Sequence, residues 1–194
     1  MRKSTLKRDT GETQLLCQLN VDGTGSLTGE TGIGFFDHML DLFAKHSGID
    51  LDLSCKGDLN VDTHHTLEDL GIVLGQSLGE ALGDKRGIKR YGTFYCPMDE
   101  TLTRVSLDLS GRGYLVFHGE IKRERVGDFE TEMLKEFLYA FAINAKMTLH
   151  VNILYGENDH HKIESIFKAL ARALKEAMSY GDDLDSIPST KGML

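Results

Sequence analysis

The sequence predicts an α+β fold built from a duplicated half-domain, and two repeated patterns predict the duplication. The first pattern, Leu-x-φ-x-Gly-x-Gly-x-Leu with φ apolar, begins at Leu19 and again at Leu107. The second, His-His-x-φ-Glu, begins at His64 and again at His160. Because both patterns recur in the same order, we interpret the chain as two copies of one structural unit.

The boundary between the copies is expected in a turn-rich, charged stretch, GDKRGIKRYG, at residues 83–92. Glycine and charged residues between two periodic segments are typical of a connecting loop. We therefore assign residues 1–86 to the first half-repeat and residues 87–194, which include an irregular C-terminal tail, to the second.

Each half is predicted to run strand, strand, strand, helix, strand, helix. Apolar residues at helical spacing predict the first helix at Phe35–His46 in one half and at Met133–Asn144 in the other. Alternating apolar and polar residues then predict a strand at Ile49–Leu53 and at Thr148–Ile153. The second helix of each half carries a matching apolar stripe, Leu67, Leu70, Leu74, Leu78 and Leu82 against Ile163, Ile166, Leu170, Leu174 and Met178.

The predicted strands have one apolar face, so each sheet needs a cover on that face. We expect two sheets, each covered by two helices. Because a half of about 90 residues buries little core on its own, we also expect the two sheets to pack together as one unit.

The composition, 40% hydrophobic and 27% charged, is that of a globular chain. Its net charge of −8 repels phosphate backbones, so nucleic acid is not an expected partner. No apolar run approaches the roughly 18 residues of a membrane span, and the N-terminal segment lacks the apolar stretch of a signal peptide. We therefore expect a cytoplasmic protein with no membrane partner.

The His-His-x-φ-Glu motifs indicate metal ligands. Side chains at i and i+4 share a helix face while neighbours point about 100° apart, so His64 and Glu68 can bind one ion and His65 is aimed elsewhere. For one motif, a surface histidine pair at a helix N-terminus is the alternative. Duplication at matched positions favours metal binding, and imidazole with carboxylate suits manganese, iron or zinc.

Two further ligands are expected on the first helix of each half. His38 lies among apolar residues in GFFDHMLDLFAKH, where a core histidine is the alternative. Glu136 lies at a similar place in MLKEFLYAFAINA and is also a ligand type that divalent ions accept. Their matched positions favour a metal role for both.

The chain resembles the imidazoleglycerol-phosphate dehydratase family from about Arg8 to Leu194. The resemblance is carried by GIGFFDHMLDLFAKHSGIDL, DTHHTLEDLGIVLG, TLHVNILYGENDHHKIESIFKALARAL and SIPSTKGML. It implies a hydro-lyase of histidine biosynthesis that removes water from imidazole glycerol phosphate to give imidazole acetol phosphate. It also implies two manganese ions per active site and a homo-oligomer, a 24-mer, with active sites between subunits, and we expect the two half-repeats to form one catalytic unit.

The resemblance also implies roles for single residues. The early segment R-x-T-x-E-T is matched by Arg8, Thr10, Glu12 and Thr13. Many family members have histidine where this chain has Glu136. Expected metal ligands are His38, His64, His65, Glu68, Glu136, His160, His161 and Glu164. Expected catalytic residues are Glu12, His38, His65, Glu68, His161 and Glu164, and expected substrate or phosphate contacts are Glu12, Arg90, Arg112, Ser189, Thr190 and Lys191.

The chemistry explains why such residues are needed. The reacting carbons of the substrate have no carbonyl beside them to stabilise the charge that develops, so a metal on a nitrogen of the neighbouring imidazole is a suitable Lewis acid. A carboxylate such as Glu12 can then act as acid and base. Two rival interpretations are a two-metal phosphohydrolase and a non-catalytic metal-binding cage. The first lacks its usual aspartate ligands here, and the second does not explain Arg90, Arg112 and the STKG tail.

One helix face cannot fill a six-coordinate shell, so the sites are expected to be shared. We expect one ion on His38, His65, His160 and Glu164 and the other on His64, Glu68, Glu136 and His161, with the two halves supplied by different chains. Metal binding would then be coupled to oligomerisation.

Overall fold

The computed structural model describes residues 1–194 and confirms the duplicated α+β fold. The first half contains β1 (Lys3–Asp9), β2 (Thr13–Asn20), β3 (Leu27–Thr28), α1 (Gly34–Ser47), β4 (Asp50–Gly57) and α2 (His64–Leu82). The second contains β5 (Tyr91–Met98), β6 (Thr101–Asp108), β7 (Tyr114–His118), β8 (Arg125–Val126), β9 (Phe129–Glu130), α3 (Met133–Asn144), β10 (Thr148–Tyr155) and α4 (Asp159–Met178).

The two sheets have the same topology. One has the order β1-β2-β4-β3 and the other β5-β6-β10-β7, so each strand of the first half has an equivalent in the second. The short strands pair in parallel at matching positions, Leu27 with Leu51 and Leu115 with Leu149. The repeated glycine pattern therefore marks the loop that leads into β3 and β7.

The small antiparallel hairpin β8-β9 has no counterpart in the first half and was not predicted. Its strands have two residues each, too few to show an alternating pattern. The Asp128 carboxylate in its turn accepts hydrogen bonds from the backbone of Gly34 and Phe35, and Glu130 accepts one from Thr63. The hairpin thus ties the N-terminal ends of α1 and α2 together.

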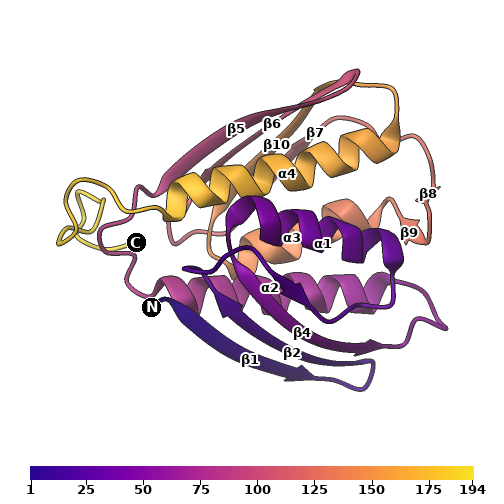
Figure 1. Ribbon diagram of the computed structural model, residues 1–194, viewed down its shortest axis with the longest axis horizontal. Helices are drawn as coiled ribbons and strands as arrows, with labels where there is room; N and C mark the ends of the chain where they lie inside the picture. Colours follow the sequence, from indigo (N-terminus) through magenta and orange to yellow (C-terminus); the bar gives the residue numbers. More distant parts are fainter.

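The four helices form a layer between the two sheets (Figure 1). Helix α2 packs on β1, β2 and β4 while α1 contacts β3, and in the second half α4 covers β5 and β6 while α3 contacts β7. Each sheet is therefore covered by two helices, as predicted. The two halves do form one unit, but α1 packs on α4 and α2 packs on α3, so helices join the halves instead of direct sheet packing. The reason is that the buried helices have apolar residues on more than one side, facing both a sheet and a helix.

Paired helices run in the same direction. Gly71 lies against Phe137 and Gly75 against Phe141, so close that an added Cβ would lie 2.8 Å and 2.7 Å from the respective carbonyl oxygens. The α1–α4 pair has the same polarity, because Phe35 contacts His160 at one end. All four helices consequently begin at the same end of the molecule, on the right in Figure 1.

The predicted apolar stripes of α2 and α4 are buried in a single core that runs through both halves. Beyond α4 the chain forms no further helix or strand, in agreement with the irregular tail expected from the sequence. None of the four helices has the length and hydrophobicity that crossing a membrane requires.

Candidate active site

The two histidine motifs open their helices as the sequence predicted. Helix α2 begins at His64, and α4 begins one residue before His160. Adjacent rings diverge, with centroids 6.2 Å apart and planes at 79° for His64 and His65. In the second motif the values are 6.1 Å and 82°. Each motif therefore presents its two imidazoles to different surroundings.

Three predicted metal ligands meet where α1 and α4 begin. His160 Nε2 lies 3.0 Å from Glu164 Oε2, and His38 Nε2 lies 3.6 Å from the same oxygen. One potential ligand atom from each of the three residues lies within 4.8 Å of the other two. His38 is half-exposed, so the core-histidine alternative is wrong. Two nitrogens and a carboxylate oxygen at this spacing form a candidate metal centre.

Glu164 is the buried member of this cluster and is kept as an anion. Burial alone would raise its pKa, but hydrogen bonds from Lys168 and His160 lower it. The Lys168 ammonium lies 2.6 Å from the second carboxylate oxygen. One oxygen of Glu164 is thus held by lysine while the other faces the two imidazoles.

The corresponding groups on α2 and α3 lie further apart. His64 Nε2 is 3.7 Å from Glu68 Oε2, and both side chains are about half exposed. Glu136 is exposed and lines a groove of about 320 Å³ with Phe117 and Ile121. It is not a member of the three-residue cluster. Within one chain, therefore, Glu136 does not complete a compact set of donors.

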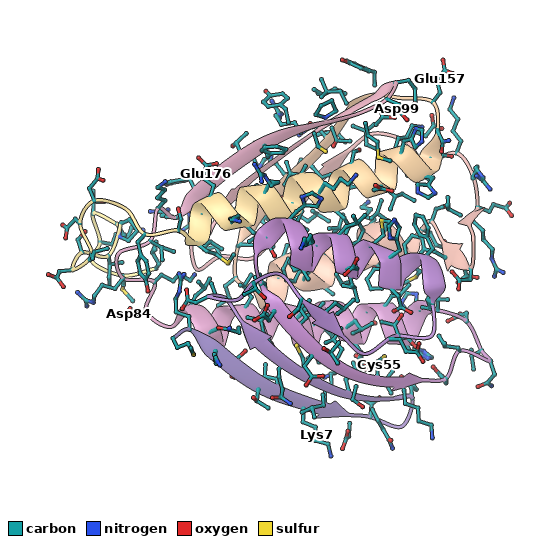
Figure 2. All side chains as sticks on the ribbon, in the orientation of Figure 1. Lys7, Cys55, Asp84, Asp99, Glu157 and Glu176 are labelled. Atoms are coloured by element: carbon teal, nitrogen blue, oxygen red, sulfur yellow. The ribbon has the colours of Figure 1, made fainter.

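The divergent histidines have carboxylate partners that the sequence reasoning missed. His65 Nδ1 is 3.0 Å from Asp58, and His161 Nδ1 is 2.8 Å from Glu100. These hydrogen bonds raise the pKa of each histidine. Asp58 precedes the first motif by only a few residues, so the sequence could have indicated it as a partner of His65. Glu100 lies in the distant β5-β6 turn, and no local pattern indicates it as a partner of His161. Its neighbours Asp99 and Glu157 are labelled in Figure 2 near the start of α4.

The predicted acid/base residue, Glu12, lies at the tip of the β1-β2 hairpin. Its Oε1 is 3.6 Å from His65 Nε2 and its side chain is 55% exposed, so it is free to contact another molecule. The hairpin is fixed from below by buried Asp69, which accepts hydrogen bonds from Arg8 at 2.8 Å and from Thr13 at 2.5 Å. Asp69 was also missed, since an aspartate inside a helix gives no sign of this partner in the sequence.

The predicted phosphate contacts converge at the other end of the molecule. A cavity of about 470 Å³ is lined by basic and hydroxyl side chains from three separate segments. Among its lining residues are Arg90, Ser110, Arg112, Ser189, Thr190 and Lys191. Positive charge and hydroxyl donors in one pocket suit an anion such as a phosphate group.

Arg90 also holds the C-terminal tail against this pocket. Two of its nitrogens donate to Asp108, at 2.6 Å and 3.0 Å, and a third donates to the carbonyl of Pro188 at 2.8 Å. The backbone at Arg90 is left-handed, with φ of 72°. Arg90 therefore fastens the tail that carries Ser189 and Lys191 to the rim of the pocket.

The metal-ligand cluster and the phosphate pocket lie at opposite ends of α4. His160 stands in its first turn, and the backbone of Arg90 donates to Ala177 in its last turn. A helix of 20 residues is roughly 30 Å long at 1.5 Å per residue. Both sets of residues therefore cannot contact one small substrate within one chain.

Comparisons with known proteins place the chain in the hydro-lyase class of enzymes. Residues 31–174 match the family model described as imidazoleglycerol-phosphate dehydratase. The chain is 59% identical over 194 residues to the imidazoleglycerol-phosphate dehydratase of Caldanaerobacter subterraneus subsp. tengcongensis and 58% identical over 194 residues to that of Oceanobacillus iheyensis, in each case covering 100% of both chains.

Solved structures give the same result for the fold. The Staphylococcus aureus imidazoleglycerol-phosphate dehydratase has a TM-score of 0.84 at 45% identity, covering 92% of this chain and 99% of that one. The Pyrococcus furiosus enzyme has a TM-score of 0.84 at 35% identity, covering 97% and 100%. The chain belongs to the imidazoleglycerol-phosphate dehydratase family, whose activity is a step in histidine biosynthesis.

Proposed function

We propose that this chain dehydrates imidazole glycerol phosphate at a two-manganese site assembled from more than one chain. The imidazole ring binds at the end where the helices begin, and the phosphate binds in the basic pocket of a neighbouring chain. The observation that carries the proposal is the length of α4, which separates the two sets of residues by far more than a three-carbon linker can span.

The residues fit the metal. His38, His160 and Glu164 already lie within 4.8 Å of one another without an ion, and nitrogen with carboxylate oxygen is a donor set that manganese accepts. His65 and His161 are outside that cluster. Their Nε2 atoms would contribute to metal sites that ligands of a neighbouring chain complete. One ion would be held by His38, His65, His160 and Glu164, and the other by His64, Glu68, Glu136 and His161. When bound to the ring nitrogens, the metal supplies a Lewis acid for the negative charge that develops on the imidazole.

Glu12 moves the proton. Its exposed carboxylate lies beside His65 Nε2, so it can reach a substrate whose ring is held there. Glu12 Oε1 accepts the proton from the carbon next to the ring-bearing carbon, and the protonated carboxyl can return a proton as the hydroxyl of the ring-bearing carbon leaves as water. The enol that results then tautomerises to the ketone. The Asp69 contacts below the hairpin keep Glu12 in place without occupying its oxygens.

The phosphate is held without being cleaved. Arg112 and Lys191 provide charge at the open side of the pocket, and Ser189 and Thr190 provide hydroxyl donors. Arg90 supports the tail on which three of these residues stand. Holding this end fixed orients the reacting carbons relative to Glu12.

Activity with imidazole glycerol phosphate and manganese tests the reaction. We expect the keto product with its phosphate retained, and we expect activity to disappear with a chelator and return with manganese. The release of inorganic phosphate as the main product would instead indicate a phosphohydrolase. Full activity in chelated protein would contradict the metal role.

Light scattering tests the shared site. We expect a large closed assembly, a 24-mer, with manganese and small oligomers without it, because each complete ligand set exists only between chains. His65→Asn and His161→Asn should give small oligomers even with manganese present. A metal-free protein with the same mass as the loaded form would contradict the model.

The location of the enzyme is proposed to be the cytoplasm. The activity of the family, a step in amino-acid biosynthesis, supports this assignment.

A further inference from the structure

His161 is held by a carboxylate that is itself fixed on all sides. Glu100 Oε2 is 2.8 Å from His161 Nδ1. The other oxygen, Oε1, accepts three hydrogen bonds, from Thr101 Oγ1 at 2.9 Å and from the backbone of Glu157 at 3.1 Å and Asn158 at 2.8 Å. The carboxylate therefore joins the β5-β6 turn to the loop before α4, and its orientation is determined.

The direction of the Glu100–His161 hydrogen bond follows from the chemistry of the two groups. An ionised carboxylate only accepts hydrogen bonds, so the ring nitrogen that faces it must carry the proton. In a neutral ring the proton then sits on Nδ1, and Nε2 keeps its lone pair. A metal binds a histidine nitrogen through that lone pair.

We infer that Glu100 is a positioning residue that fixes the tautomer of His161 and thereby presents Nε2 as a metal ligand. The inference rests on the proposed function in that His161 is taken to bind manganese. Glu100 touches neither substrate nor metal and acts only through the histidine ring. Its role explains why a residue 61 positions earlier in the sequence is tied to the start of α4.

The equivalent histidine in the first half provides an internal contrast. Asp58 Oδ2 holds His65 Nδ1 at 3.0 Å, but Asp58 Oδ1 is buried with no hydrogen-bond partner. An asparagine at position 58 can therefore turn its amide and still accept from the ring. A glutamine at position 100 cannot turn, because its nitrogen would then face the three donors that now contact Oε1.

Glu100→Gln thus reverses a hydrogen bond with almost no change in shape. The glutamine nitrogen donates to His161 Nδ1, and the ring proton moves to Nε2, which blocks the metal. We expect manganese affinity to fall roughly 10- to 100-fold, the usual effect of losing such a partner. Asp58→Asn should lower the manganese affinity clearly less. Glu157→Gln, which removes an exposed charge from the loop before α4, should leave the manganese affinity unchanged.

The measurement is a manganese titration of the full-length protein, with free Mn²⁺ followed by electron paramagnetic resonance. His161→Gln and the double variant His161→Gln/Glu100→Gln complete the set. If Glu100 acts through the ring, the double variant binds no more weakly than His161→Gln alone. A loss of the same size in both backgrounds would show a merely structural role and overturn the inference.

Two results separate this inference from the proposed function. If His161→Gln weakens manganese binding but Glu100→Gln does not, the inference fails and the proposed site stands. If His161→Gln has no effect, both fail. Should Glu100→Gln not fold, nitrogen-15 NMR of the histidine rings in the metal-free wild type decides. We expect the Nδ1–H tautomer for His161, and an Nε2–H tautomer would overturn the inference.

Discussion

The β1-β2 and β5-β6 turns occupy equivalent places in the repeat, but the glutamates that they carry have different roles. Glu12 and Glu100 are separated by the same interval as Leu19 and Leu107. Glu100 uses its own carboxylate to fasten its hairpin to the loop before α4. Glu12 is exposed, and its hairpin is fastened by Asp69 instead.

The difference shows how a duplicated unit can release one side chain for chemistry. In the first half, Arg8 and Thr13 bind Asp69 on α2, so the hairpin is anchored without Glu12. The position equivalent to Asp69 in the second half is Ser165, whose hydroxyl only donates to a carbonyl of its own helix. There the hairpin depends on Glu100, which is correspondingly unavailable to substrate.

The two Gly-x-Gly loops differ in the same way. In the first half, the Asp50 carboxylate accepts hydrogen bonds from the backbone of Thr24, Gly25 and Ser26 and fills the loop. The equivalent residue in the second half is Thr148, which is uncharged, and that loop carries Arg112 on the wall of the basic pocket. One loop is closed by the protein's own anion and the other is open to an external one.

The largest effect is expected from Glu12→Gln. Losing the acid/base should reduce turnover roughly 10²–10⁴-fold. Manganese affinity should remain that of the wild type, since Glu12 is not proposed as a ligand. Glu100→Gln is the matched variant and should lose metal affinity. Steady-state kinetics combined with manganese titration checks both variants. The same defect in both would contradict the different roles of Glu12 and Glu100.

Arg112→Ala tests the open loop. Removing a charge-assisted contact of about 1.5–3 kcal/mol should raise the KM roughly 10- to 100-fold with unchanged manganese affinity. Thr24→Ala, the equivalent change in the closed loop, should leave KM as it is. Arg90→Ala should raise KM as well, because it also releases the tail at Pro188. Unchanged Michaelis constants in both arginine variants would mean that the pocket does not bind the phosphate.

Asp69→Asn addresses the hairpin anchor. Asparagine removes the negative charge that pairs with Arg8, and an amide nitrogen that faces the Thr13 hydroxyl reverses the direction of that hydrogen bond. We expect kcat to fall by about tenfold through misplacement of Glu12, with a much smaller change in KM. Ser165→Ala is the control in the second half, and an equal fall in its kcat would argue against a specific anchor.

Asp50→Asn should affect stability only. Hydrogen bonds, first from the Thr24 backbone, hold the pKa of Asp50 well below its usual range. A lowered pKa stabilises the fold above the ordinary value of about 4 and loses that contribution as the pH falls below it. We expect the variant to be about 1–2 kcal/mol less stable near neutral pH and to differ less in acid. Chemical denaturation across the pH range checks this, and a constant difference would contradict the charge argument.

The sequence by itself determined the duplication, the element order and the residue types of the candidate site. These are local properties: the apolar spacing of a helix, the alternation of a strand and the i, i+4 geometry of His160 and Glu164 are the same wherever the segment lies. Family motifs added the reaction class. The strands β8 and β9 were not predicted, because a segment of two residues cannot show the alternation of apolar and polar residues that identifies a strand.

Only the tertiary structure decided which distant residues meet. Asp69 under the Glu12 hairpin, Glu100 behind His161 and Asp128 at the start of α1 depend on how elements far apart in sequence pack, and no local pattern encodes that. The same packing set the helices between the sheets and pointed all four in one direction. It thereby placed the metal ligands at one end of α4 and the phosphate pocket at the other, a separation that the linear order of the motifs does not reveal.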